Sequence, residues 1–146
     1  MKRKKGFTLI ELMIVLAVIA ILAAVLVPQT GIFKGQAKNT GVITNINSVR
    51  AFLETKTGAD FFEGKEAGKE STDLQSAIIS AMTVDNEKFV NPIDSSKTAV
   101  IVVTADITPT NDNVGQVIVI YNKTGKSYSI YGVNGDLSKT DPITIK

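Results

Sequence analysis

The strongest constraint on this chain is an apolar run close to its N-terminus. Residues 7–27 read FTLIELMIVLAVIAILAAVLV, and among these 21 residues a single side chain, that of Glu11, is charged. As an α-helix that rises about 1.5 Å per residue, the run spans roughly 31 Å, which matches the hydrocarbon core of a bilayer. No second apolar run of this length follows in the sequence. We therefore predict one membrane-spanning helix.

Basic residues flank this run on one side only. Residues 2–5, of sequence KRKK, stand before it, and no basic residue follows until Lys34. Because basic flanks are retained in the cytoplasm, we expect the N-terminus inside and residues 29–146 across the membrane. An ordinary secretory signal peptide would have a shorter apolar core that ends in a small-residue cleavage site. An uncleaved signal anchor fits the length and the charge equally well.

Composition argues against several kinds of function. The sequence contains neither Cys nor His, so it can form no disulfide and lacks the side chain most often used as a general base. The formal charge is +2, but setting aside residues 1–6 leaves twelve basic against fourteen acidic side chains, a charge of −2. The net positive charge therefore indicates a targeting segment and not a nucleic-acid-binding face. We expect no enzymatic activity, no cofactor, no nucleic acid and no small-molecule substrate.

The carboxylate inside the apolar run requires an explanation. An acidic residue at the centre of a span costs about 2.5 to 3.5 kcal/mol, and less near an end. The side chain of Glu11 can extend to the interface, or it can pair with a cation inside an assembly. Cleavage after Gly6 would create such a cation, because Phe7 would then carry a free α-amino group one helical turn from Glu11. The pair could form within one chain or between neighbouring copies.

The residues around this junction resemble the prepilin signature of type IV pilins and of the pseudopilins of type II secretion. The signature reads KKG here, followed by FTLIEL and the long apolar run. The resemblance implies that a prepilin peptidase cuts after Gly6 on the cytoplasmic side and N-methylates the new first residue, Phe7. It also implies that Phe7 and Glu11 serve subunit docking and that Pro28 bends or breaks the helix. The resemblance does not extend recognisably through residues 60–146.

Helical spacing continues beyond Pro28 in a more polar sequence. Val42, Ile46, Val49 and Leu53 recur at intervals of four, three and four, which predicts a helix with one apolar face. We expect that face to pack against a globular head. Proline and glycine both weaken a helix, so the proline at 28 and the glycines that follow it lead us to expect a local loss of helix near Pro28 on assembly.

The remainder of the chain predicts a short helix and then strands. Ser71 or Thr72 would cap a helix that runs through Met82, with Leu74, Ile78 and Ile79 as its buried positions. Residues 98–107, 115–121, 127–133 and 143–145 are rich in Val, Ile, Thr and Tyr, which is typical of strands. Their connections look too short for parallel crossovers, so we expect an antiparallel meander. Gly125 would take a positive φ in one turn, and Asn134-Gly135-Asp136 would form another.

These elements predict an α+β fold, a pilin-like roll in which a long N-terminal helix packs on a C-terminal antiparallel sheet. We divide the chain into a cleaved leader (1–6), a transmembrane and filament-core helix (7–27), an amphipathic helix (28–57) and a globular head (58–146). Many proteins of the resembling family close the end of the head with a disulfide or a calcium ion. Here Cys is absent and Asp106, Asp112 and Asp136 lack a calcium-loop spacing, so we expect strand pairing and packing to close it without a metal.

The resemblance implies a structural subunit of a type IV pilus that forms a homopolymer with other copies of itself. Its partners would be the prepilin peptidase, the cytoplasmic membrane and the pilus assembly machinery. It would be a single-pass membrane protein before assembly and part of an extracellular filament afterwards. A pseudopilin of a type II secretion or DNA-uptake system is the alternative. A signal-anchored enzyme or receptor is a third hypothesis, and retention of the leader would favour it.

Overall fold

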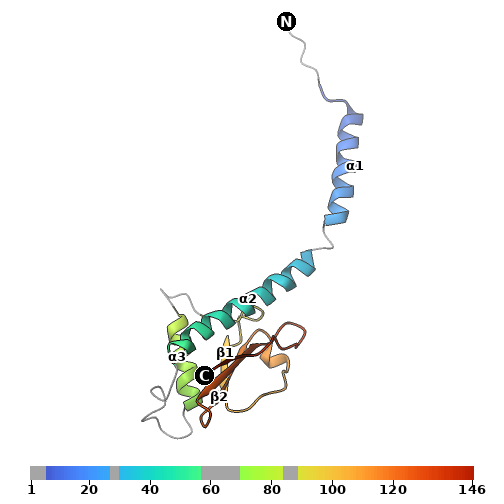
Figure 1. Ribbon diagram of the computed structural model, residues 1–146. Coiled ribbons are helices and arrows are strands. Elements are labelled where there is room, and N and C mark those ends of the chain that lie inside the picture. Colours follow the sequence, from blue (N-terminus) through green and yellow to red (C-terminus); the bar gives the residue numbers. More distant parts are fainter. Residues whose placement is uncertain (1–5, 27–29, 57–69, 84–88) are drawn as a thin grey trace. The chain divides into compact units, whose positions relative to one another are not determined.

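A computed structural model of the chain describes residues 6–26, 30–56, 70–83 and 89–146 (Figure 1). The chain divides into two compact units, Met1–Gly35 and Gln36–Lys146, which are described separately. The helices are α1 (Leu9–Leu26), α2 (Thr30–Glu54) and α3 (Glu70–Met82). The strands are β1 (Val100–Val103), β2 (Val117–Asn122), β3 (Ser127–Gly132) and β4 (Ile143–Ile145), with a 3₁₀ turn at Asn111–Asn113 before β2.

The main core of the second unit lies between two helices and one face of a sheet (Figure 1). The predicted apolar stripe of α2 is confirmed, because its four residues at positions 42, 46, 49 and 53 are all buried. Helix α3 contributes Leu74 and Ile78, whereas Ile79 is only partly buried. Alternate residues of the strands face these helices, as the two-residue period of a strand requires. They are Val100, Val102, Val117, Val119, Tyr121, Tyr128, Ile130 and Ile145.

The four strands form one sheet in the order β1-β2-β3-β4. Strands β2 and β3 pair antiparallel, as do β3 and β4, where Ile130 lies opposite Ile143. The prediction of a wholly antiparallel meander is wrong at the first pair, since β1 runs parallel to β2 with Val100 opposite Val117. The reason is strand length. Strand β1 ends at Val103, so residues 104–116 form the connection, and this is long enough for a crossover.

The second face of the sheet carries a smaller apolar cluster. Ile118, Tyr131 and Val133 are buried there, and Ile101, Val103, Ile107 and Ile120 pack against them while staying partly exposed. Ile107 belongs to the crossover between β1 and β2, so this connection covers part of the sheet. Both faces of the sheet are thus shielded, one by helices and the other by a loop.

Strand β1 stands at one edge of the sheet, and helix α3 protects that edge. The side-chain oxygen Oε1 of Gln75 accepts a hydrogen bond from the backbone amide of Val102 at 3.2 Å. Unpaired amides of an edge strand are templates for pairing with another chain. The Gln75 side chain removes one of them from that role.

Two local predictions are corrected by the structure. Helix α3 begins at Glu70, so Ser71 and Thr72 lie within its first turn and not at a capping position before it. Positive φ angles occur at Gly115, Lys126 and Leu137 among the described residues, and not at Gly125. In the turn between β2 and β3, the side-chain oxygen of Asn122 accepts a bond from the Gly125 amide at 2.8 Å, which stabilises the turn without the left-handed glycine that we expected.

Helix α2 approaches strand β3 so closely that only glycine fits at position 132. A Cβ atom there would overlap Val42 Cγ1 and lie 2.9 Å from Ile46 Cδ1. Overpacking of a core costs about 1–3 kcal/mol, so Gly132→Ala should lower the free energy of unfolding by about that amount in a urea titration. Gly135→Ala is the matched control, because the nearest atoms to its Cβ would lie 4.0 Å away. Equal stability of the two variants would contradict this packing.

Candidate functional site

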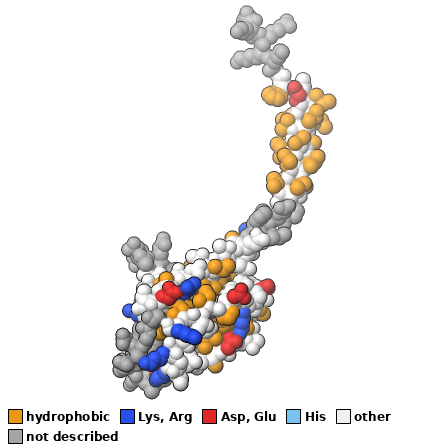
Figure 2. Space-filling model, viewed as in Figure 1, with side chains coloured by type: hydrophobic (Ala, Val, Ile, Leu, Met, Phe, Trp, Pro, Cys, Tyr) orange, Lys and Arg blue, Asp and Glu red, His pale blue; other side chains and the backbone are white. Residues whose placement is uncertain are grey.

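Helix α1 presents apolar side chains on all sides and buries none of them within the chain. Figure 2 shows these side chains along the length of the helix, with one acidic side chain near its N-terminal end. Among the described residues, α1 is a helix long and apolar enough to cross a membrane. Leu9, Ile21 and Leu26, for example, are 76%, 66% and 69% exposed. Such a surface requires lipid or other protein chains around it, because the exposure of so much apolar surface to water is unfavourable.

The N-terminus of α1 is closed by reciprocal hydrogen bonds between Thr8 and Glu11. The Thr8 amide and hydroxyl both donate to Glu11 Oε2, at 2.8 and 2.6 Å. In return the Glu11 amide donates to the Thr8 hydroxyl at 3.3 Å. This is a capping box, in which a threonine before the helix and a glutamate three residues later satisfy each other's amides. It supplies donors to the Glu11 carboxylate within a single subunit.

The capping box leaves part of the carboxylate open to another donor. All the hydrogen bonds to Glu11 described here involve Oε2 and not Oε1. The positive end of the helix dipole also favours a negative charge in this first turn. Glu11 is therefore oriented and partly compensated before any second chain approaches, and it retains acceptor capacity for one.

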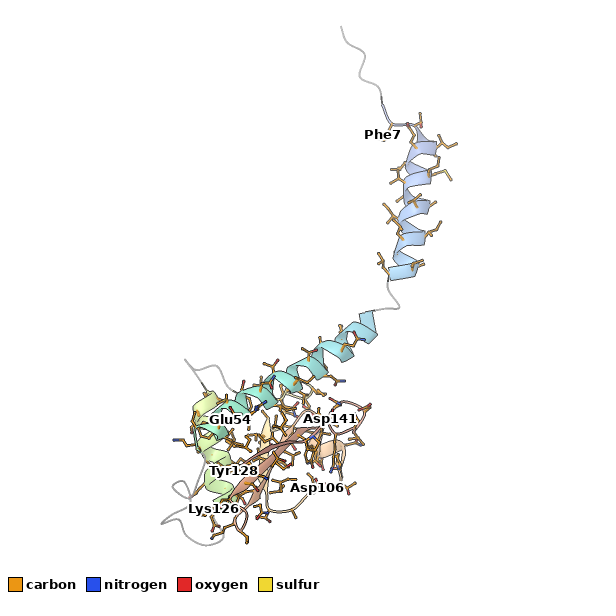
Figure 3. The ribbon with its side chains drawn as sticks, in the orientation of Figure 1. Phe7, Glu54, Asp106, Lys126, Tyr128 and Asp141 are labelled. Carbon is orange, nitrogen blue, oxygen red and sulfur yellow. The ribbon has the colours of Figure 1, made fainter. Side chains whose placement is uncertain are left out.

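The predicted processing site lies in the non-helical residues directly before this helix. Gly6 and Phe7 precede α1 and are not helical, and Phe7, labelled in Figure 3, is 88% exposed. Glu11 lies in the first turn of α1, so the structure brings the sequence-predicted residues Gly6, Phe7 and Glu11 to the same end of one element. Pro28, the predicted helix break, lies outside the described residues.

Thr8 is the functional candidate that we did not single out from the sequence. Its signal was present, since Thr8 and Glu11 match the spacing S/T-x-x-E that precedes many apolar helices. We interpreted Glu11 through extension to the interface or through a counter-charge, and not through its neighbour Thr8. The structure adds that a neutral neighbour already orients its carboxylate.

A second polar cluster, here named the head clasp, consists of Asp106, Tyr131 and Lys139. The Lys139 ammonium donates to both carboxylate oxygens of Asp106 at 2.8 Å, and the Tyr131 hydroxyl donates to Asp106 Oδ1 at 2.8 Å. The ammonium also lies 4.7 Å from the centre of the Tyr131 ring. The head clasp joins the β1–β2 crossover to β3 and to the loop before β4. A cavity of about 210 Å³ lies beside it, lined mainly by apolar surface that includes Ile120 and Pro142.

The polar groups of the head clasp bond to one another. The carboxylate is engaged by two donors, and the Lys139 ammonium holds the pKa of Asp106 below its ordinary value, with the Tyr131 hydroxyl acting in the same direction. The other two aspartates considered in the sequence lie elsewhere: Asp136 accepts from the Ser138 hydroxyl, and Asp112 lies 4.0 Å from Lys97. Within the described ranges, no three carboxylates come together to hold a metal ion.

The head clasp predicts an acid-sensitive head. A carboxyl group whose pKa is lowered on folding stabilises the fold at pH above its unfolded pKa, and this contribution is lost as pH falls through the folded pKa. The pKa of Asp106 is lowered, so the unfolding free energy of the full-length protein in detergent should fall below about pH 4, and less so in Asp106→Asn. Asp141→Asn, an exposed position labelled in Figure 3, is the control. Parallel pH profiles for Asp106→Asn and the unmodified protein would contradict the assignment.

A buried amide closes the region that has no disulfide to hold it. Asn91 is only 2% exposed, and its Oδ1 accepts from the amides of Ile93 and Asp94 at 2.9 and 3.0 Å. Its Nδ2 donates to the Val114 carbonyl at 2.8 Å. The loop before β1 is thereby tied to the crossover that leads into β2. Sequence reasoning expected strand pairing and packing to close the head, and this polar network adds to them.

Comparisons with known proteins agree with the geometry of α1. Residues 1–27 match the family described as the prokaryotic N-terminal methylation motif. The N-terminal segment thus carries this methylation motif, and it leads into an α+β chain whose mostly antiparallel sheet packs on helices.

The individual relatives carry fimbrial names. The chain is 40% identical over 72 residues to a fimbrial protein of Pseudomonas aeruginosa. This match covers 49% of this chain and 44% of the relative. It is 42% identical over 66 residues to type IV major fimbrial protein FimA of Dichelobacter nodosus, a match that covers 45% of this chain and 40% of the relative. It is 50% identical over 54 residues to type IV wide pilus major component PilA4 of Thermus thermophilus, a match that covers 37% of this chain and 41% of the relative. The matches therefore span less than half of each of these relatives. No solved structure matches significantly.

Proposed function

We propose that this chain is a structural subunit of a type IV pilus, made as a membrane-anchored prepilin and assembled into a surface filament. The observation that carries the proposal is α1, a helix apolar on every side whose N-terminus holds one oriented carboxylate within the methylation motif. The proposed role is mechanical and not enzymatic. The fimbrial names of the relatives favour a pilus over the pseudopilus that the same motif allows.

The proposed processing fits the local backbone. A prepilin peptidase would cut the bond between Gly6 and Phe7 and then methylate the Phe7 amine. This bond lies in non-helical chain, and nothing lies within 4 Å of the position that a Cβ of Gly6 would occupy. An exposed, non-helical segment is one that a peptidase active site can engage. The Thr8 amide that bonds Glu11 follows the bond to be cut, so the capping box would persist after cleavage.

The proposed assembly step exchanges lipid for protein around α1. Apolar side chains gain little hydrophobic energy on leaving lipid, so close packing and polar contacts must favour association. The Phe7 amine of one copy would approach the open side of the Glu11 carboxylate of a neighbour. In such surroundings opposite charges attract more strongly than in water. Outside the membrane the same helices would be shielded only by one another, and Pro28 would supply a local break in helical hydrogen bonding.

The decisive experiment is intact-mass and N-terminal analysis of protein sheared from the cell surface. We expect the chain to begin at Phe7, to carry one methyl group on that amine and to be the main component of long filaments. A chain that keeps residues 1–6 and stays in the membrane fraction would refute the proposal and favour a signal anchor. Correct processing with no long surface filament would favour the pseudopilin instead.

A further inference from the structure

The turn that precedes β4 contains a chemically reactive pair. Residues 134–138 reverse the chain direction: the amide of Asn134 donates to the Ser138 carbonyl at 2.9 Å, and the amide of Leu137 donates to the Asn134 carbonyl at 3.1 Å. Gly135 follows Asn134 directly and is exposed. Across this turn Val133 pairs with Lys139, the cation of the head clasp.

An asparagine followed by glycine can react with its own backbone. The amide nitrogen of the glycine attacks the side-chain carbonyl carbon of the asparagine, and the absent Cβ of glycine leaves that approach unhindered. Asn134 is the only asparagine in the 146-residue sequence that precedes a glycine. The buried Asn91 precedes Pro92, whose nitrogen carries no proton and cannot react in this way.

We propose that Asn134 is a site of spontaneous deamidation in the folded head. The backbone nitrogen of Gly135 loses its proton and bonds to Cγ of Asn134, while the Cγ–Nδ2 bond breaks and the leaving nitrogen departs as ammonia. Water then opens the resulting five-membered imide at either carbonyl and yields aspartate or isoaspartate. The net reaction consumes one water and releases one ammonia, and it requires no enzyme, metal or oxidant.

Asn134 is half-buried at the start of an exposed turn, and its surroundings favour this position over the exposed asparagines. The Gly135 amide has only a long bond, 3.4 Å, to Asn39 Oδ1, so its nitrogen is weakly engaged. Asn134 Nδ2 donates to the Ser138 hydroxyl at 2.9 Å, and that hydroxyl donates to Asp136 at 2.6 Å. The rest of the turn, residues 135–138, is exposed. Asn122, by contrast, precedes Lys123, whose side chain obstructs the same attack.

The product would weaken the turn in which it forms. A carboxylate at position 134 could no longer donate to Ser138, and it would lie close to the like charge of Asp136. Isoaspartate also inserts an additional carbon into the backbone between Val133 and Lys139, which alters their pairing. Since Lys139 holds Asp106, the change would reach the head clasp. The fraction of chains modified at Asn134 would therefore increase with the time since synthesis. The modification would loosen the head of each chain that carries it.

The test is a timed incubation of the purified full-length protein in detergent, in water labelled with heavy oxygen. Trypsin releases residues 127–139 as one peptide and residues 98–123 as another, so Asn134 and the control Asn122 are measured in the same digest. We expect the first peptide to gain one labelled oxygen as two separable isomers, at a rate that rises with pH. Labelling of Asn134 no faster than that of Asn122 would overturn the proposal.

The matched variant is Gly135→Ala. Its φ is not left-handed and its Cβ would have no neighbour closer than 4.0 Å, so the fold should be unaffected. A Cβ at the attacking residue should slow the labelling of position 134 on the order of tenfold. An unchanged rate in this variant would mean direct hydrolysis without the imide, which would also overturn the proposal.

Discussion

Cells that carry Glu11→Ala should insert the chain into the membrane normally and yet form no filaments. The substitution makes the span more apolar, so insertion is favoured. In the assembled filament it would leave the Phe7 amine of a neighbour buried without a counter-charge. Removing one partner of a buried ion pair costs about 3–5 kcal/mol, which weakens each contact more than a hundredfold. The measurement is electron microscopy of surface fibres together with immunoblotting of the membrane fraction.

Glu11→Gln separates the charge of this residue from its role in the helix cap. Glutamine can replace glutamate in a capping box, so the hydrogen bond from the Thr8 amide can be kept while the charge is lost. We expect no fibres from this variant either. Thr8→Ala is the complementary control, because it removes the cap and keeps the charge, at a cost of about 1 kcal/mol. Fibres from Glu11→Gln at the normal level would show that the cap suffices and would refute the electrostatic mechanism.

Gly115→Ala should be the most destabilising single-methyl change in the head. Gly115 has a φ of 79°, and a Cβ there would overlap Asn91 Oδ1 and lie 2.7 Å from Asn91 Cγ. A left-handed conformation costs a non-glycine residue roughly 1–2 kcal/mol. Displacing Asn91 would also leave its Nδ2, in a buried side chain, and the half-buried amides of Ile93 and Asp94 without their partners, at about 1–3 kcal/mol. The combined loss of about 2–5 kcal/mol is a large share of the 5–15 kcal/mol that is typical of a folded domain.

Urea unfolding of the full-length protein in detergent would measure this loss. Gly125→Ala is the matched control, since its φ is not left-handed and its Cβ would lie 3.1 Å from Asn122 Nδ2, in an exposed side chain whose displacement costs at most its one bond to the Gly125 amide. We expect Gly125→Ala to stay close to the unmodified protein. If Gly115→Ala were equally stable, the contact between Gly115 and Asn91 would not be what holds the crossover in place.

The features predicted correctly from the sequence are those that local pattern encodes. The helical stripe from Val42 to Leu53 and the short strand Ile143–Ile145 depend on periodicity and residue type within one segment. The cleavage, methylation and docking roles of Gly6, Phe7 and Glu11 stay predictions, which depend on a continuous motif. Thr8 was missed although its spacing from Glu11 was equally local.

The features that escaped prediction depend on residues distant in sequence. The head clasp joins Asp106 to Lys139, 33 positions away, and the bond from Asn91 to the Val114 carbonyl spans 23. Contacts over such separations cannot be predicted from the periodicity of a local segment. The parallel pairing of β1 and β2 was missed because the first strand was expected to continue to residue 107, whereas the ladder ends at Val103. Composition predicts a preference, but the end of a strand is set by what lies beside it.

The Gln75 side chain on the edge of β1 bears on how a crowded fibre keeps its subunits distinct. In the proposed filament, heads displayed at high local density would bring many sheet edges close together, and free edges can pair into a continuous sheet. Because the Val102 amide is already occupied, β1 offers one donor fewer for such pairing, and cohesion between neighbours would depend more on the helices and on side-chain contacts.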